Sequence, residues 1–240
     1  MNHNESKTPL RQSDFEGLQR FGTCVVSNAI EKSGVRLRNE GYMNGAVRCY
    51  TPDLRPLLGY AVTGTVRTST APVAGAYYHT NMDWWHYVAT LPEPRVLVLQ
   101  DADEKPGSGA LWGELNGVIA MALGCVGVVT NGAIHDLPQL REMAFHLFAG
   151  SVIVSHAYAH VAKFGESVEI GGLSIAPGDL IHGDLHGVHT IPLAIAPELI
   201  AATQEVLYRE REFVEFCRSP EFSLRKLSQK LDDVFREGLA

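Results

Sequence analysis

The sequence predicts an α/β fold, with one domain built on a parallel β-sheet and a C-terminal helical extension. Apolar strands at 95–100 and 126–130 enclose a helical stretch at 110–123, and a second helix at 138–144 leads to a strand at 147–155. Connections this short favour parallel neighbouring strands with right-handed crossovers. No Pro/Gly-rich linker divides the apolar segments, so we expect a loose N-terminus at 1–12, a single α/β domain at 13–196 and helices at 197–240.

The first third of the chain predicts one long helix and one strand. Asp14 is a candidate cap for a helix that runs to Lys32, because apolar residues recur at helical spacing until Ser33-Gly34. Residues 35–58 are expected to be irregular, and the alternation at 60–68 indicates a strand. A helix is expected from 80 to 89. We expect its Trp84-Trp85 pair, like the Tyr77-Tyr78 pair, to serve a core or an interface.

The last third predicts short strands and then helices. Residues 167–170 form a candidate strand, and the turn-rich stretch 171–191 is expected to be β. From Pro197 the pattern is helical, with a break at Ser219-Pro220. The extension is longer than its own core requires, so we expect it to pack on another subunit.

Composition narrows the classes of partner. The chain has 240 residues, a net charge of −7 and 45% hydrophobic residues, as an ordinary globular protein does. Its basic residues are scattered, which argues against nucleic acid, and no apolar run approaches the roughly 20 residues of a membrane span. The N-terminus lacks a signal-peptide core, and the four cysteines form no CxxC pair. We therefore expect a cytoplasmic protein with no membrane partner.

The stretch GCVGVVTNGAIHDLP, residues 124–138, is the richest in chemistry. A buried strand ends at Asn131-Gly132 and is followed by His135-Asp136. In open α/β sheets, ligands bind at the carboxyl ends of the strands, where a carboxylate such as Asp136 suits a hard divalent cation. Asp136 is equally well suited to cap the helix that begins near Pro138, and both roles are compatible.

Glu114 opens the preceding helical stretch, after Gly107 and Gly109. Free backbone N–H groups at such a helix start suit a carboxylate or a developing negative charge. The simpler interpretation is that Glu114 only complements the helix dipole. Since 110–116 and 131–136 should emerge at the same sheet edge, we keep Glu114 as a candidate site residue.

Histidines concentrate in the second half of the chain, with seven of the ten between His135 and His189. On a strand, His182, Asp184 and His186 would share a face and could converge on a zinc ion. The neighbouring glycines favour instead a tight turn held by Asp184. His156 and His160 have i,i+4 spacing, but no HExxH motif accompanies them. Most of these histidines are expected to be hydrogen-bonding groups within packed structure.

Several motifs in order resemble the family of the regulator of ribonuclease activity A and the 4-hydroxy-4-methyl-2-oxoglutarate aldolases. They are Gly113-Glu114-Leu115, GCVGVVTNGAIHD and PGDLIHGDLHGVHTIP, with AVTGTV at 61–66 similar to an early family strand. The resemblance is collinear from about Thr23 to Pro197. It implies an α/β/α sandwich of the phosphohistidine-domain-like type. It also implies assembly as a homotrimer or homohexamer, with the site in a cleft between subunits.

The resemblance also implies roles for individual residues. Asp136 corresponds to the aspartate that binds Mg²⁺ or Mn²⁺. The loop that binds the pyruvoyl end corresponds to Gly113, Glu114, Leu115 and Asn116. The substrate-binding arginine of the family corresponds to His135, which cannot offer the arginine's bidentate fork. Asp184 and His186 are additional candidates for the pocket.

The leading hypothesis is a divalent-metal-dependent lyase that acts on a small 2-oxo acid such as 4-hydroxy-4-methyl-2-oxoglutarate or oxaloacetate, by retro-aldol cleavage or decarboxylation. Glu114, His135 and Asp136 are its candidate catalytic residues. An alternative is a non-catalytic regulator that binds a protein such as a ribonuclease. A third is a related metal enzyme with another substrate, such as a sugar acid.

Overall fold

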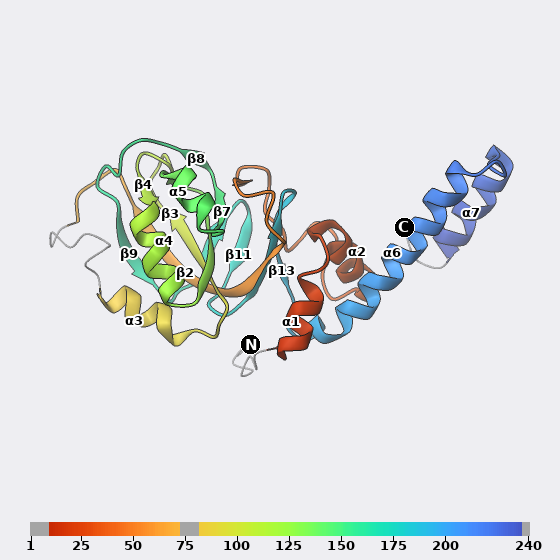
Figure 1. Cartoon of the computed structure of the whole chain (residues 1–240), viewed down its shortest axis with the longest axis horizontal. Coiled ribbons are helices and arrows are strands. Elements are labelled where there is room, and N and C mark those ends of the chain that lie inside the picture. The colour runs from red at the N-terminus through yellow and green to blue at the C-terminus, as the bar shows by residue number, and fades with distance from the viewer. Residues whose placement is uncertain (1–9, 73–81, 237–240) are drawn as a thin grey trace.

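A strongly curved β-sheet forms the centre of the computed structural model, which describes residues 10–72 and 82–236 (Figure 1). Its strands follow the order β1-β7-β5-β3-β2-β12-β13, and β9 pairs with β2. The members are β1 (Arg48–Cys49), β2 (Leu57–Arg67), β3 (Arg95–Asp101), β5 (Cys125–Thr130), β7 (His146–Ala149), β9 (His160–Phe164), β12 (Leu180–Asp184) and β13 (Gly187–Ile191).

The middle of this sheet is parallel. β2 pairs in parallel with β3, β3 with β5, and β5 with β7, whereas β1, β9, β12 and β13 run antiparallel to their neighbours. The predicted α/β class is thereby confirmed, because buried strands that alternate with short helices pair in parallel. β9 was not predicted, and the expected strand at 147–155 is two strands, β7 and β8 (Ser151–Val152).

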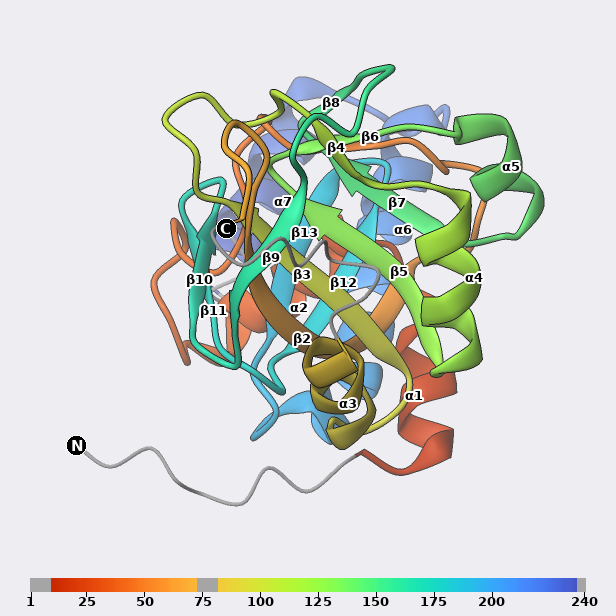
Figure 2. The same ribbon diagram turned by 90° about the vertical axis from the view of Figure 1, so that its left-hand side faces the viewer.

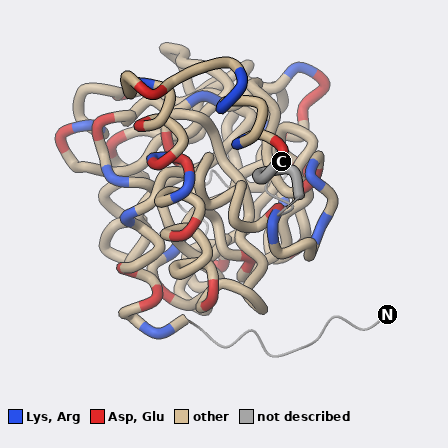
Figure 3. Tube along the Cα trace, turned by 90° about the vertical axis from the view of Figure 1, so that its right-hand side faces the viewer, with Lys and Arg blue, Asp and Glu red and all other residues tan. Residues whose placement is uncertain are grey.

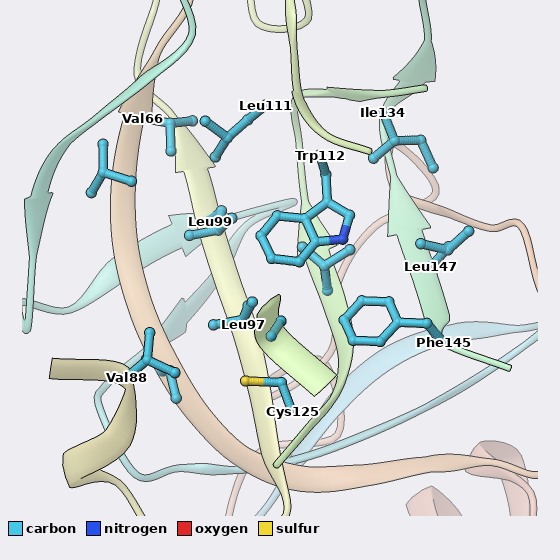
Figure 4. Packing of buried hydrophobic residues seen from close by; sticks show 14 of the residues in the cluster. Val66, Val88, Leu97, Leu99, Leu111, Trp112, Cys125, Ile134, Phe145 and Leu147 are labelled. Carbon is cyan, nitrogen blue, oxygen red and sulfur yellow. The ribbon is translucent and has the colours of Figure 1, made fainter. Parts of the chain in front are cut away.

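Alternate residues of the central strands enter two different cores. Val62, Leu97 and Leu99 pack beneath α3 (Met82–Thr90), α4 (Glu114–Ala122) and α5 (Leu137–Glu142), and Figure 4 shows part of this core. Val96 and Val98 belong to the core on the other face, which β10 (Val168–Ile170) and β11 (Leu173–Ile175) cover. Figure 2 shows the helices outside the curved sheet and the β10–β11 hairpin at its side.

The aromatic residues of α3 belong to the first core. Trp84 and Trp85 are buried there, which confirms the expected core role of this pair. Tyr77-Tyr78 and the expected first residues of the helix, 80 and 81, lie outside the described residues.

The predicted bounds of two helices differ from those in the structure. The helix expected over 14–32 is two helices, α1 (Gln12–Leu18) and α2 (Thr23–Ser33). Asp14 is no cap, because it lies inside α1 and pairs with Arg11. The stretch expected to be helical from 110 begins as a strand, β4 (Ala110–Trp112), and the helix starts only at Glu114. In both places a polar contact from a distant segment interrupts the helical pattern, as described below.

The C-terminal helices, α6 (Ala196–Arg218) and α7 (Leu224–Arg236), form an arm that leaves the body of the molecule (Figure 1). The first half of α6 packs on α1 and α2 through residues such as Leu199 and Val206. Seen from this end of the molecule, segments with Lys and Arg are interspersed with segments with Asp and Glu (Figure 3). Within the described part of the chain, no helix is long and apolar enough to cross a membrane.

Candidate active site

Two very short strands bring the candidate site together. β4 pairs in parallel with β6 (Ala133–Ile134), and the His135 N–H donates to the Trp112 carbonyl at 2.9 Å. The residues that follow each strand, 113–114 and 135–136, therefore lie side by side. Trp112 is fully buried and stacks on Phe145 with ring centroids 5.9 Å apart, which anchors the strand end (Figure 4).

Asp136 is oriented by contacts from both of these segments. Its Oδ2 accepts a hydrogen bond from the Glu114 N–H at 3.1 Å, and its Oδ1 lies 3.0 Å from His135 Nδ1. The side chain remains 38% exposed. Its backbone is left-handed, with φ 54° and ψ 36°, a conformation that aspartate adopts more readily than most residues.

Asp136 thus caps a helix other than its own. It precedes α5, but its side chain makes no capping hydrogen bond there. Instead the carboxylate sits at the N-terminus of α4, where the helix leaves N–H groups without acceptors of its own. The carboxylate therefore lies where α4 presents its positive end and where solvent still reaches it.

His135 donates a hydrogen bond to that carboxylate. Because a carboxylate only accepts, Nδ1 carries the proton in this contact. Burial lowers the pKa of His135, and nearby His156 lowers it further, against the opposing effect of Asp136. Nε2 is buried and has no hydrogen-bond partner among the described residues. The ring centroid of His135 lies 4.3 Å from that of His156, and the two rings are nearly perpendicular, at 86°.

The remaining residues of the loop differ in exposure. The side chains of Glu114 and Leu115 are exposed, whereas Asn116 is buried and its Nδ2 donates to the Leu111 carbonyl at 2.8 Å. The side chain of Asn116 therefore holds the loop from inside. A ligand at this helix start would meet the backbone N–H groups of the first turn, which the helix itself does not satisfy. Gly113 packs closely against the side chains of His135 and Asp136, which leave no room for a Cβ at this position.

The donor set at Asp136 fits a hard cation that keeps most of its water. Among residues 10–72 and 82–236, no three His, Cys, Asp or Glu side chains are grouped so as to hold a metal. A single half-exposed carboxylate matches Mg²⁺ or Mn²⁺, since Mg²⁺ is commonly bound through one or two carboxylates and several waters. It does not match zinc, which takes three or four protein ligands.

Among the residues that the structure describes, His182, Asp184 and His186 do not form the zinc site that was considered for them. His182 and His189 are buried and contact each other, with Nδ1 of His182 2.8 Å from Nε2 of His189. Asp184 accepts from the N–H and hydroxyl of Thr23, at 2.8 and 2.7 Å, and so caps α2. Burial works to raise the pKa of Asp184, but hydrogen bonds from Thr23 and His186 outweigh it and the pKa is lowered.

Asp184 and His186 also lie away from Asp136 within one chain. β12 ends at Asp184 beside Leu57, where β2 begins, because the two strands are antiparallel. Asp136 follows the opposite ends of the parallel strands. His186 instead lines a hollow of about 330 Å³ between α2 and the start of β13, which Glu31, Arg38 and Tyr42 also line.

His156 is the contact that the sequence did not reveal. The i,i+4 spacing paired it with His160, but it belongs to the loop between β8 and β9 and lies against His135. The one signal in the sequence that pointed to His156 was the concentration of histidines between 135 and 189. It carried no information on which of them meet.

Comparison with known proteins places these features in a family. The model of the Aldolase/RraA family matches residues 23–189. A putative 4-hydroxy-4-methyl-2-oxoglutarate aldolase of Halalkalibacterium halodurans is 36% identical over 75 residues, which is 31% of this chain and 36% of that protein. The chain aligns with less than two thirds of the length of each of the curated relatives it matches.

Two solved structures share the fold. An uncharacterized protein from Pseudomonas syringae pv. tomato superposes with a TM-score of 0.74 at 21% identity, over 96% of this chain and 99% of its own. RraAS2 from Streptomyces coelicolor, described as an unusual member of the RNase ES inhibitor RraA protein family, superposes with a TM-score of 0.65 at 20% identity, over 88% of this chain and 98% of its own. At these identities the likeness extends to the fold alone.

Proposed function

Because the chain belongs to the Aldolase/RraA family, we propose that it is a divalent-metal-dependent lyase acting on a small 2-oxo acid. The observation that carries the proposal is the Asp136 carboxylate, 38% exposed and oriented at the N-terminus of α4. The name of the H. halodurans relative supports 4-hydroxy-4-methyl-2-oxoglutarate as one substrate. Oxaloacetate is a second, because its decarboxylation develops negative charge at the same carbon of the product. The cytoplasm remains the compartment we propose.

Asp136 would hold Mg²⁺ or Mn²⁺. When bound, that cation supplies a Lewis acid for the 2-oxo group and stabilises negative charge as the carbon–carbon bond breaks. The first-turn N–H groups at Leu115 and Asn116 would bind the substrate carboxylate. The Glu114 side chain, which is exposed, would exchange a proton with the product.

His135 can make fewer hydrogen bonds to a substrate carboxylate than the arginine that the family resemblance predicts at this position. Its Nδ1–H already donates to Asp136, so the ring offers no second parallel donor to a carboxylate. Losing a bidentate, charge-assisted pair costs on the order of 1.5–3 kcal/mol, or about 10–100-fold in binding. We therefore expect this enzyme to bind its 2-oxo acid more weakly than an arginine-containing relative, or to prefer a substrate such as a sugar acid.

The test is pyruvate release from 4-hydroxy-4-methyl-2-oxoglutarate and from oxaloacetate with Mg²⁺ or Mn²⁺, alongside a panel of sugar acids. Asp136→Ala should abolish metal-dependent turnover, whereas Asp53→Ala, at an exposed position, should leave it unchanged. Full activity of Asp136→Ala, or turnover that persists after chelation, would refute the proposal.

The surface around the site supports assembly with further copies of the chain. Leu115, Val118 and Met121 are 63%, 53% and 43% exposed and follow one face of α4. Contiguous exposed apolar residues typically mark an interface. We propose that this face, which begins beside Glu114, packs on another subunit in a homotrimer or homohexamer.

A second candidate is a regulator that binds a protein such as a ribonuclease. His135 in place of arginine and the same apolar face of α4 favour it, and the S. coelicolor neighbour is described as related to an RNase inhibitor. A regulator would bind purified ribonuclease equally well with Asp136→Ala and less well with Val118→Glu. It would show no metal-dependent turnover.

A further inference from the structure

We propose that His156 is a positioning residue for the candidate site: it fixes the ring of His135, which in turn orients the Asp136 carboxylate. The inference deepens the proposed function and rests on it as far as Asp136 is taken to hold the metal. The contacts that carry it form a continuous series from β4 through His156, His135 and Asp136 to α4.

The first step is that His156 is itself held firmly. Its Nδ1 lies 3.1 Å from the Ala110 carbonyl, which can only accept, so Nδ1 carries a proton. The Ala110 N–H donates to the Ser155 carbonyl at 2.8 Å. Both backbone groups of Ala110 therefore hold this loop: its N–H binds Ser155 and its carbonyl binds the His156 ring.

Gly109 makes this close approach possible. A Cβ at position 109 would lie 2.4 Å from the His156 carbonyl oxygen and 2.8 Å from the Ala157 Cβ. Ala157 has a left-handed backbone with φ 48°, which is unusual for alanine. The loop is therefore a specific structure whose conformation places the His156 ring against β4 and His135.

The second step is the contact between the two imidazoles. The rings meet nearly perpendicularly, with centroids 4.3 Å apart, so His156 limits the rotation of the His135 ring on one side. On another side the ring meets Gly113: Nε2 of His135 occupies the space that a Cβ at position 113 would need, 2.4 Å from its ideal position. Confined in this way, His135 presents Nδ1 to Asp136.

The third step is the carboxylate. With Oδ1 on His135 Nδ1 and Oδ2 on the Glu114 N–H, both oxygens of Asp136 have a defined direction. Loss of His156 would release the His135 ring and with it one of these two contacts. Removing a group that hydrogen-bonds to a metal-binding carboxylate, as His135 does to Asp136, typically changes metal affinity by 10–100-fold, and His156 acts through this contact.

The experiment compares His156→Ala and His156→Phe with the wild type. Alanine removes both the ring and the bond to Ala110, whereas phenylalanine keeps a flat ring against His135. His160→Phe is the matched control, because His160, the first residue of β9, also has its Nδ1 close to a carbonyl, 2.8 Å from that of Tyr158. The readouts are Mn²⁺ affinity by electron paramagnetic resonance, the tautomer of His135 by ¹⁵N NMR assigned with His135→Gln, and pyruvate release.

We expect His156→Ala to weaken Mn²⁺ binding at least 10-fold and to convert the single Nδ1–H tautomer of His135 into a mixture. His156→Phe should lose less, and His160→Phe should match the wild type. If alanine destabilises the loop, folded His156→Gln, which also lacks a ring against His135, decides in its place. A folded variant without the ring, His156→Ala or His156→Gln, that keeps the wild-type Mn²⁺ affinity and His135 tautomer overturns the proposal.

The two proposals fail in different ways. A wild type that binds Mn²⁺ but releases no pyruvate from any substrate refutes the lyase, and the positioning role is then decided by affinity and tautomer. A wild type that binds no Mn²⁺ refutes the metal site, and the tautomer alone decides for His156. Normal turnover in every folded His156 variant, with an unchanged tautomer, refutes the positioning role and leaves the lyase standing.

Discussion

Gly113→Ala is the substitution whose effect the structure defines most closely. Gly113 has φ −149° and ψ −168°, extended backbone that any residue adopts, so an alanine there meets no conformational penalty. The cost is steric. Its Cβ would lie 2.4 Å from His135 Nε2 and 2.7 Å from Asp136 Oδ2, where ordinary contact begins at 3.4 Å.

The magnitude follows from these distances. The His135 ring must recede by about 1 Å, and His156 bounds the space on one side of it. Overpacking of this kind costs about 1–3 kcal/mol of unfolding free energy, and each kcal/mol lowers the Tm by about 2–4 °C in a chain of this size. A displacement of about 1 Å at a reacting group costs on the order of 100-fold in rate.

The assay is kcat/KM for metal-dependent pyruvate release, with thermal unfolding measured in parallel. Gly45→Ala is the matched control, because a Cβ there has no atom within 4 Å. We expect Gly113→Ala to lose about 100-fold in kcat/KM and Gly45→Ala to lose none. If Gly113→Ala kept the Tm and kcat/KM of the control, the close packing of Gly113, His135 and Asp136 would be refuted.

Three further outcomes are expected. Asp184→Ala should lower the free energy of unfolding in urea by about 1–2 kcal/mol, because Thr23 loses its cap, and a midpoint equal to that of Asp53→Ala would contradict this. Burial lowers the pKa of His146 from 6.5 to about 4, so the unfolded chain binds the extra proton first as the pH falls. Stability should therefore drop by about 1–2 kcal/mol between pH 7 and pH 5 from this residue, and His146→Gln should remove that part of the slope. Val118→Glu should reduce the oligomer seen by light scattering, and an unchanged mass would exclude α4 from the interface.

The parallel core was predictable because its signals are local. The apolar run at 126–129 and the short apolar strand at 95–100 identify buried strands wherever they occur, and the connections between them are too short for other pairings. The chemistry-bearing residues Glu114 and Asp136 were also found locally, from a carboxylate that follows a strand and another at a helix start.

The contacts between those residues were not predictable in the same way. Asp136 binds the N–H of Glu114, 22 positions earlier, and the strands that join them have two and three residues, too few to show a period. Similarly, Asp184 caps α2 from 161 positions away. The apolar periodicity continues past Gly22, so the sequence alone predicted a single helix there. Side chains that satisfy distant backbone N–H groups leave no pattern in the sequence.

The left-handed backbone at position 136 has an evolutionary consequence. Aspartate, asparagine and glycine tolerate φ 54° best, so few other residues are accommodated here at low cost. Asparagine would keep the turn and an oxygen acceptor for α4 while removing the negative charge. A single-nucleotide change can convert one into the other, since their codons differ at the first base only. An exchange of Asp136 for asparagine would therefore remove the charge that the proposed cation site needs and leave the turn in place.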